Sequence, residues 1–270
     1  MARISMNELT TYRWSFEEDV ANYAKVGLDA ISVWRQKLSD FGNERGLELI
    51  GESGLRVASL LWAGGFTGSD GRSFKESIED AHDAIRCAAR MHAECLIVYT
   101  GTRAGHTHSH ARRLLSNALA DLLPHAREEG VTLALEPMHA ECAREWTFLT
   151  SVDETVQLLR QVDDPCLKMA FDTFFFGTDR GIVERLKELV PFLAIVQLGD
   201  TRRPPDGDQD RCLLGSGLVP LGPIVSALLE AGYAGSFDVK LMGQEIETSD
   251  YQELLRQSRD TVTRLASAAV

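Results

Sequence analysis

Cysteine is scarce in this sequence of 270 residues, and no two cysteines stand in a CxxC pair. The five cysteines are scattered: Cys87, Cys95, Cys142, Cys166 and Cys212. A disulfide framework is typical of an even number of closely spaced cysteines, and a structural zinc knuckle needs paired ones. The sequence therefore argues against both and indicates a protein of the reducing cytoplasm.

Positive charge and long apolar runs are also in short supply. Lys and Arg number 28 against 40 Asp and Glu, which gives a formal net charge of −12. Proteins that bind nucleic acid by neutralising phosphates carry the opposite sign. No segment approaches the roughly 18 apolar residues of a membrane span, and residues 1–14 lack the apolar core of a signal peptide. We expect a cytoplasmic protein with no nucleic-acid or membrane partner.

Linkers, low-complexity tracts and charge blocks are missing as well, so nothing marks a domain boundary. Short apolar runs alternate instead with longer amphipathic segments, which is typical of βα units around a parallel sheet. The eight expected strands are Arg3–Met6, Ala30–Trp34, Arg56–Leu61, Cys95–Thr100, Val131–Glu136, Leu167–Asp172, Leu193–Leu198 and Phe237–Leu241. One α/β barrel takes about 250 residues. The sequence therefore predicts a single (β/α)₈ TIM barrel over residues 1–270.

The segments between these runs carry helix signals. Ser15 and Glu18 form a capping-box pattern before an amphipathic stretch that ends at Gly27. A weaker helical pattern lies around Phe41–Gly54. Apolar residues at helical spacing predict the remaining helices over Ser73–His92, Ser109–Glu129, Val152–Val162, Gly181–Val190, Leu221–Ala231 and Tyr251–Ala266.

Polar side chains at the C-terminal ends of the strands are the first candidates for function, because the βα loops there carry the chemistry of such barrels. Glu136 and Asp172 each end an apolar run, which is typical of a metal site, a proton-transfer site or a rim ion pair. The amide of Gln197 suits either a divalent metal or backbone partners. Lys240 either points inward and pairs with carboxylates, or points outward as a surface lysine.

Four strand-end motifs carry a resemblance to a known family. In chain order they are ALEPMH, AFDTFFF, VQLGD followed by LLGSGLVPL, and AGYAGSFDVKLMGQEIE. The chain resembles the sugar phosphate isomerase/epimerase group of xylose-isomerase-like barrels (the AP endonuclease family 2 superfamily), most specifically over Val131–Glu247. The resemblance implies a divalent cation (Mn, Mg, Co or Zn) held by Glu, Asp, His or Gln, and Glu on strands five to eight. Those positions hold Glu136, Asp172, Gln197 and Lys240 here.

The sequence departs from the family's pattern at three positions. Lys240 replaces a metal-binding glutamate, Phe175 replaces a histidine that serves the substrate, and Ser216 replaces a glutamate in a GxG loop. Two unit charges about 4 Å apart repel by roughly 4 kcal/mol at an effective dielectric constant of 20, so an ammonium group opposes a metal ion. We therefore expect weak or absent metal binding, with Glu136, Asp172 and Gln197 as a degenerate ligand set.

Three functional interpretations remain open. In the first, a sugar isomerase or epimerase-like enzyme moves a proton beside the carbonyl group of a carbohydrate-type or cyclitol-type substrate. Glu136 is then the base, Lys240 replaces the metal as electrophile, and Asp172 completes the catalytic set. In the second, Lys240 is the Schiff-base or electrostatic catalyst of a lyase, dehydratase or aldolase. In the third, the barrel binds a sugar-like ligand or a partner without catalysis.

Substrate contacts are expected from residues near the same strand ends. Trp34 and Trp62 end two strands, where aromatic rings stack on sugar faces or pack the rim. His139 and Phe175 each lie three positions after an expected site carboxylate, and Arg202 suits an anionic group or a nearby aspartate. The histidine-rich run over 105–110 is interpreted as a solvated loop. An AP endonuclease needs a histidine-rich trinuclear site and a basic face, so that activity is not expected; a homo-oligomer is left open.

Overall fold

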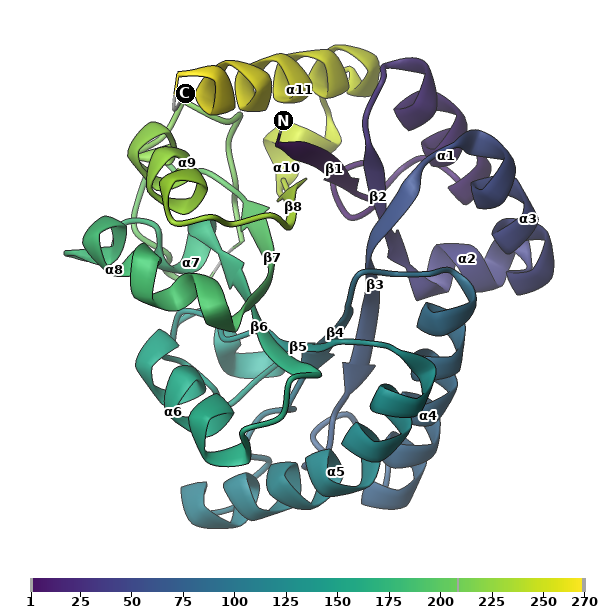
Figure 1. Cartoon of the computed structure of the whole chain (residues 1–270), viewed down its shortest axis with the longest axis vertical. Helices are drawn as coiled ribbons and strands as arrows, with labels where there is room; N and C mark the ends of the chain where they lie inside the picture. Colours follow the sequence, from purple (N-terminus) through teal and green to yellow (C-terminus); the bar gives the residue numbers. More distant parts are fainter. Residues whose placement is uncertain (1, 208, 269–270) are drawn as a thin grey trace.

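The computed structural model describes residues 2–207 and 209–268, and within them eight parallel strands form a closed barrel with helices outside (Figure 1). Each strand pairs with its neighbours in the chain, and the first pairs with the last. The strands are β1 (Arg3–Asn7), β2 (Ala30–Trp34), β3 (Arg56–Gly64), β4 (Leu96–Tyr99), β5 (Leu133–Leu135), β6 (Leu167–Asp172), β7 (Leu193–Leu198) and β8 (Ser236–Val239). The expected TIM barrel is thus confirmed.

The register of the last three strands positions the site. Asp172 of β6 lies beside Gln197 of β7, and Gln197 lies beside Asp238 of β8. Side chains alternate between the two faces of a strand. Lys240, two residues beyond Asp238, therefore points to the same interior as Asp172 and Gln197.

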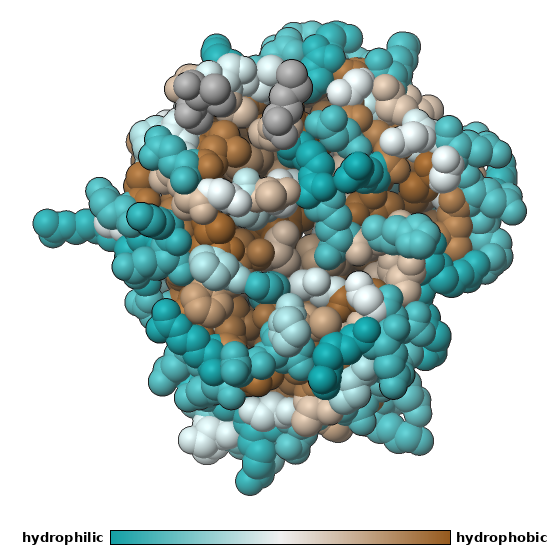
Figure 2. Space-filling model, in the orientation of Figure 1, coloured by the Kyte–Doolittle hydropathy of each residue, from teal (hydrophilic) through white to brown (hydrophobic). Residues whose placement is uncertain are grey.

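Helices cover the outside of the barrel. Ser15 and Glu18 form the expected capping box of α1, and Ser73 and Glu76 form another at the start of α4. The main helices are α1 (Phe16–Lys25), α2 (Arg35–Phe41), α3 (Asn43–Ser53), α4 (Phe74–Arg90), α5 (His108–Glu129), α6 (Val152–Val162), α8 (Ile182–Leu189), α9 (Leu221–Glu230) and α11 (Tyr251–Ser267). Short helical turns are η1 (Ala143–Glu145), α7 (Thr173–Phe176), η2 (Val190–Phe192) and α10 (Gln244–Glu247). Hydrophilic side chains, teal in Figure 2, spread widely over the surface seen there.

Some element boundaries differ from those expected. Helix α2 begins directly after β2, where no helix is predicted, and β3 continues to Gly64 rather than ending at Leu61. The histidine-rich run is only partly a loop, because α5 begins at His108 with Thr107 as its N-cap. No helix of residues 2–207 and 209–268 is long and apolar enough to span a bilayer.

Candidate active site

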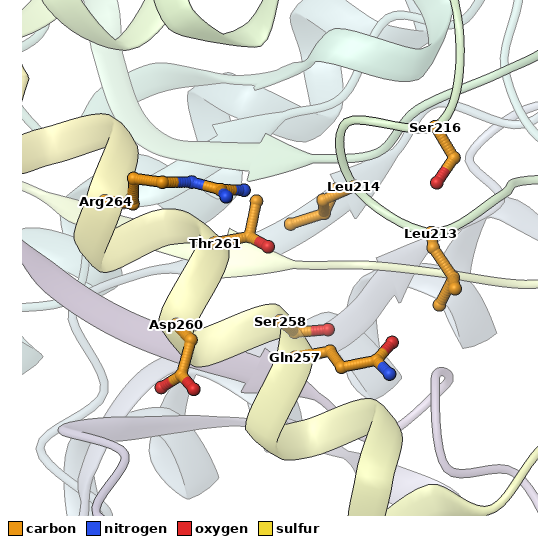
Figure 3. A pocket seen from close by; sticks show the side chains of 8 residues that line it. All are labelled: Leu213, Leu214, Ser216, Gln257, Ser258, Asp260, Thr261 and Arg264. Atoms are coloured by element: carbon orange, nitrogen blue, oxygen red, sulfur yellow. The ribbon is translucent and has the colours of Figure 1, made fainter.

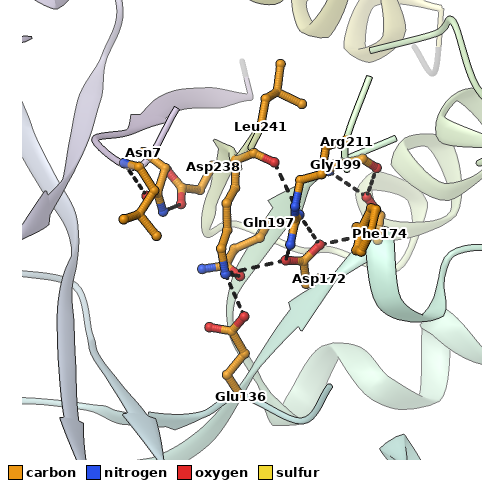
Figure 4. A network of polar contacts seen from close by, with 12 residues as sticks. Asn7, Glu136, Asp172, Phe174, Gln197, Gly199, Arg211, Asp238 and Leu241 are labelled. Atoms are coloured by element: carbon orange, nitrogen blue, oxygen red, sulfur yellow. Dashed lines mark hydrogen bonds and ion pairs between the residues drawn. The ribbon is translucent and has the colours of Figure 1, made fainter. Parts of the chain in front are cut away.

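The ammonium group of Lys240 lies at the centre of the strand-end residues. Its Nζ atom donates to Glu136 Oε1 at 2.7 Å and to Gln197 Oε1 at 3.0 Å, and lies 3.5 Å from Asp172 Oδ2. The Lys240 side chain is 1% exposed, so the surface-lysine interpretation is wrong. Figure 4 shows Glu136, Asp172 and Gln197 directed toward one another from β5, β6 and β7. The structure thus brings the four strand-end residues together.

A buried arginine that sequence reasoning did not single out completes this cluster. Arg211 Nη1 donates to Asp172 Oδ1 at 2.9 Å, and Nη2 lies 2.9 Å from Oδ2. The guanidinium group also donates to the backbone carbonyl of Lys240 at 3.2 Å and stacks 4.3 Å from the ring centre of Phe174. Two cations therefore balance two buried carboxylates, which gives a formally neutral site around Lys240, Arg211, Glu136 and Asp172.

Tyr99 is a second residue that the sequence did not reveal. It ends β4, and its hydroxyl group donates to Glu136 Oε2 at 3.0 Å. Burial, followed by the charge of Glu136, raises the pKa of the Tyr99 phenol well above its usual value, so the phenol stays protonated. Both oxygens of Glu136 thus accept a hydrogen bond, one from Lys240 and one from Tyr99.

The donor set of this chain does not fit a divalent metal. The point on which Glu136, Asp172 and Gln197 converge is taken by the ammonium group of Lys240. Arg211 in addition forms an ion pair with Asp172, donating to Oδ1 and placing Nη2 2.9 Å from Oδ2. In the described residues there is no group of three or more His, Cys, Asp or Glu side chains arranged to hold a metal ion.

A pocket of about 260 Å³ opens above Lys240. Five of its described lining residues form an aromatic wall: Tyr12, Trp34, Trp62, Tyr99 and Trp146. The remaining ones are Leu9, Met138, Gln209, Lys240, Met242 and Glu247. Trp34 and Trp62 stack with ring centres 6.5 Å apart, and Trp146 meets Trp62 edge to face at 5.2 Å. Trp34 and Trp62 therefore lie where substrate-binding residues were expected.

Three other residues that were expected to contact the substrate are not among the described residues that line this pocket. Phe175 is fully buried and packs against Phe174 and Phe176, because its ring belongs to the apolar helical turn α7. His139 Nδ1 accepts from the backbone of Glu141 in the loop after β5. Arg202 is 57% exposed and forms an ion pair with Glu245 at the rim.

A larger hollow of about 430 Å³ lies between α11 and the loop that leads to α9 (Figure 3). Its described lining combines Gln257, Thr261 and Arg264 of α11 with Leu214 and Ser216 of the loop. None of the strand-end residues contributes to that lining. Ser216, which stands where the family carries a glutamate, thus faces α11.

A closed barrel whose strands five to eight direct polar side chains toward one another, with Lys240 lining a pocket, defines a TIM-barrel protein with an enzyme-like site. The family model described as "Xylose isomerase-like TIM barrel" matches residues 20–261, and the chain belongs to that family.

Known proteins with similar sequence or structure include isomerases and epimerases. An inosose isomerase of Halalkalibacterium halodurans is 24% identical over 208 residues, which cover 75% of this chain and 72% of the relative. An IolI protein solved with a bound zinc atom superposes with a TM-score of 0.85 at 20% identity, covering 99% of both chains. An L-ribulose 3-epimerase superposes with a TM-score of 0.82 at 20% identity, covering 100% of this chain and 96% of the other. These structural matches show the same fold.

Proposed function

We propose that the chain is a sugar or cyclitol isomerase/epimerase-like enzyme that moves a proton at the carbon beside a carbonyl group. The observation that carries this proposal is the position of Lys240, which lines the pocket while it donates to Glu136. The similarity to an inosose isomerase, whose name denotes a ring-ketone substrate, supports the same reaction class.

In this proposal the substrate carbonyl oxygen accepts a hydrogen bond from Lys240. The proton of the neighbouring carbon leaves, its bonding electrons form the C=C bond of an enediolate, and the ammonium group stabilises the new oxyanion. Protonation of the same carbon on its opposite face completes epimerisation. Protonation of the former carbonyl carbon completes isomerisation, provided that the proton of the neighbouring hydroxyl group moves to the former carbonyl oxygen. A fixed cation of this chain thus supplies the charge stabilisation.

The base in this reaction is Glu136, assisted by Tyr99. Glu136 is 1% exposed and is absent from the described pocket lining, whereas Tyr99 lines the pocket. The Tyr99 hydroxyl therefore takes the substrate proton as it passes its own proton to Glu136 Oε2. Charge is conserved, because the carboxylate becomes neutral as the enediolate forms.

The Schiff-base interpretation is less compatible with this geometry. Nucleophilic attack on a carbonyl carbon needs a free amine lone pair. Lys240 Nζ instead donates to Glu136 and Gln197 and lies close to Asp172. We also propose that the enzyme needs no metal cofactor.

We propose further that the protein works in the cytoplasm. In the described residues, no disulfide joins its cysteines.

Hydrogen exchange tests the proposal. The protein is incubated in D₂O with inosose, L-ribulose and 2-hydroxycyclohexanone, each with and without EDTA, and deuterium beside the carbonyl group is measured by NMR. We expect incorporation into at least one ketone at a rate that EDTA does not change. Lys240→Met should abolish it, whereas Lys187→Met on the exposed surface of α8 should not. Exchange with none of the three ketones would contradict the proposal.

Borohydride separates the electrostatic role of Lys240 from covalent catalysis. Treatment of the protein with each ketone and borohydride should leave the mass of the chain unchanged. A ketone-dependent mass increase located at Lys240 would instead establish the Schiff-base interpretation.

A further inference from the structure

We propose that the hollow between α11 and the loop that leads to α9 is a second ligand site, which binds a small phosphate monoester. The proposal goes beyond the proposed function, because no described residue lines both this hollow and the pocket above Lys240. It rests on an arginine without an acidic partner, on hydroxyl groups without partners, and on the size and lining of the hollow (Figure 3).

Arg264 brings an uncompensated positive charge to the hollow. It lies in the last turn of α11, is exposed, and forms no ion pair with any residue of 2–207 and 209–268. Asp260, the one acidic residue in the described lining, accepts instead from Arg259 at 2.7 Å. Figure 3 shows its carboxylate directed away from the guanidinium group of Arg264. The N–H donors of Arg264 are therefore free for a ligand.

Hydroxyl groups beside Arg264 also lack hydrogen-bond partners in the part of the chain that the structure describes. Ser258 is 3% exposed and lines the hollow, yet its side chain makes no hydrogen bond there. Thr261 of α11 and Ser216 of the loop line the same hollow, and their hydroxyl groups are unpaired as well. A nearly buried hydroxyl group without a protein partner favours a polar group from outside the chain.

An arginine beside several hydroxyl groups matches a phosphate group better than a carboxylate. The planar guanidinium group donates two parallel hydrogen bonds to a pair of anionic oxygens. A carboxylate offers only that pair, whereas a phosphate monoester offers three strong acceptor oxygens. With Arg264 on two oxygens, the third remains for the hydroxyl groups of Ser258 and Thr261. The donor set thus favours phosphate.

The size of the hollow calls for more than a phosphate group. Its volume of about 430 Å³ lies within the range of roughly 300–1,000 Å³ common for small-molecule sites. Leu213 and Leu214 give it an apolar side on the loop, opposite the polar side chains of α11. The phosphate group then lies against α11, and the carbon part of the ester contacts the leucines.

A matched pair of ligands tests the proposal by calorimetry. Butyl phosphate and pentanoate carry the same butyl group and differ in the anionic group. Each is titrated into the whole protein, alongside inorganic phosphate, in about 0.15 M NaCl to screen interactions between exposed charges. We expect butyl phosphate to bind about tenfold or more tightly than pentanoate. It should also bind severalfold more tightly than inorganic phosphate, because the butyl group contacts the leucines.

Arg264→Gln should weaken the binding of butyl phosphate by about tenfold or more, because it removes the cation that pairs with the phosphate group. Arg256→Gln is the matched control. It removes the same charge from the same helix, but Arg256 forms its ion pair with Glu253 and does not appear in the described lining of the hollow. Its affinity should stay close to that of the unaltered protein.

Ser258→Ala tests the hydroxyl groups separately and should weaken binding severalfold. The matched control is Ser267→Ala, because the hydroxyl group of Ser267 on the same helix donates to the backbone carbonyl of Thr263. That substitution should leave the affinity for butyl phosphate unchanged. Circular dichroism checks the fold of all four variants.

Equal affinity of Arg264→Gln and the unaltered protein for butyl phosphate would overturn the proposal. So would equal losses in Arg264→Gln and Arg256→Gln, because net charge alone would then explain the binding. Absence of binding would overturn it too, and tighter binding of pentanoate would remove the phosphate class. The titrations need no turnover, so their outcome is independent of the deuterium exchange that tests the proposed function.

Discussion

Buried charges around one lysine determine how the site responds to substitution. Lys240 and Arg211 neutralise Glu136 and Asp172, and all four side chains are at most 1% exposed. Removal of one partner from a buried ion pair leaves an uncompensated charge and destabilises a protein strongly. Near-isosteric substitutions are therefore the informative ones, and each needs a parallel measurement of stability.

Glu136→Gln is expected to lower deuterium exchange at the substrate carbon by at least about a hundredfold, because an amide cannot accept the proton. The amide oxygen can still accept from Lys240, so the fold should persist. Exchange is measured by NMR, and circular dichroism checks the fold. Near-normal exchange in a folded variant would rule out Glu136 as the base.

Tyr99→Phe tests the relay separately from the carboxylate. The ring still packs against Trp62 and Trp146, but the hydrogen bond to Glu136 Oε2 is lost. Exchange should slow by about 10²–10⁴-fold, the usual contribution of a positioned acid–base group, while ligand affinity changes little. If exchange continues at the parent rate, Glu136 receives the proton directly.

Lys240→Glu is expected to create divalent-metal binding. The substitution turns a local charge of +1 into −1 and adds a carboxylate to Glu136, Asp172 and Gln197, the donor types that Mn²⁺ accepts. Calorimetry with MnCl₂ should show binding at least about tenfold tighter than in the parent. Lys240→Gln is the matched control for loss of charge alone. Tight Mn²⁺ binding by the unaltered protein would contradict the metal-free proposal.

At the scale of elements, Asp200 organises the loop that joins β7 to α9. Its carboxylate accepts from the backbone N–H groups of Gly215, Gly217 and Val219 at 2.9–3.1 Å. A Cβ atom at Gly217 would lie 2.2 Å from Asp200 Oδ1, so this position requires glycine. The GSG motif thus has a structural cause, and Asp200 shapes the loop rather than the pocket floor.

Asp200→Ala should therefore lower the free energy of unfolding by about 3 kcal/mol, since several N–H groups lose a charged acceptor. Urea unfolding followed by circular dichroism measures the change. Asp210→Ala in the same loop is the control, because Asp210 is exposed and its ion pair with Arg203 contributes little. Equal effects of the two substitutions would refute the role of Asp200.

The elements also show what sequence patterns can and cannot predict. Apolar runs located all eight strands because buried parallel strands are apolar throughout, and strand ends identified Glu136, Asp172, Gln197 and Lys240. Helix α2 escaped prediction because it follows β2 without a turn residue and its N-cap, Trp34, makes no side-chain cap.

The remaining site residues lacked a local signal. Arg211 lies in the same charged loop as Arg202 and Arg203. Only the fold shows that, of these three arginines, Arg211 is the one that contacts Asp172. In the sequence, Tyr99 looks like another buried residue of an apolar strand. Its role depends on a hydrogen bond to Glu136, which lies 37 positions later in the chain, so no local pattern reveals it.

At the scale of the whole molecule, buried carboxyl groups shape the dependence of stability on pH. Burial raises the pKa of Asp238 inside the barrel to about 6, and it raises that of Asp19 beside Lys37 to about 6 as well. Burial is also the main cause that raises the pKa of Glu8 well above its usual value. In the unfolded chain the pKa of an aspartate is about 3.9. The folded state therefore binds more protons between about pH 4 and 6, so these groups make stability fall as pH rises through that window.

Asp238→Asn should remove part of this dependence. A shift of roughly two pKa units corresponds to about 2–3 kcal/mol, so the loss of stability between pH 4 and pH 7 should be smaller in the variant by about that amount. Urea unfolding at several pH values measures it. Asp260→Asn on the surface of α11 is the control and should follow the parent curve. A parent-like curve for Asp238→Asn would mean that Asp238 is not protonated in this range.

The closure of the barrel has a consequence for the synthesis of the protein on the ribosome. Strand β1 needs β8 as one of its two neighbours, and Ser5 donates to Asp238, 233 positions later in the chain, at 2.8 Å. Strand β1 thus leaves the ribosome long before β8, the strand that pairs with one of its edges. Until β8 has been translated, that edge of β1 is unpaired, and unpaired strand edges are prone to pair with other chains.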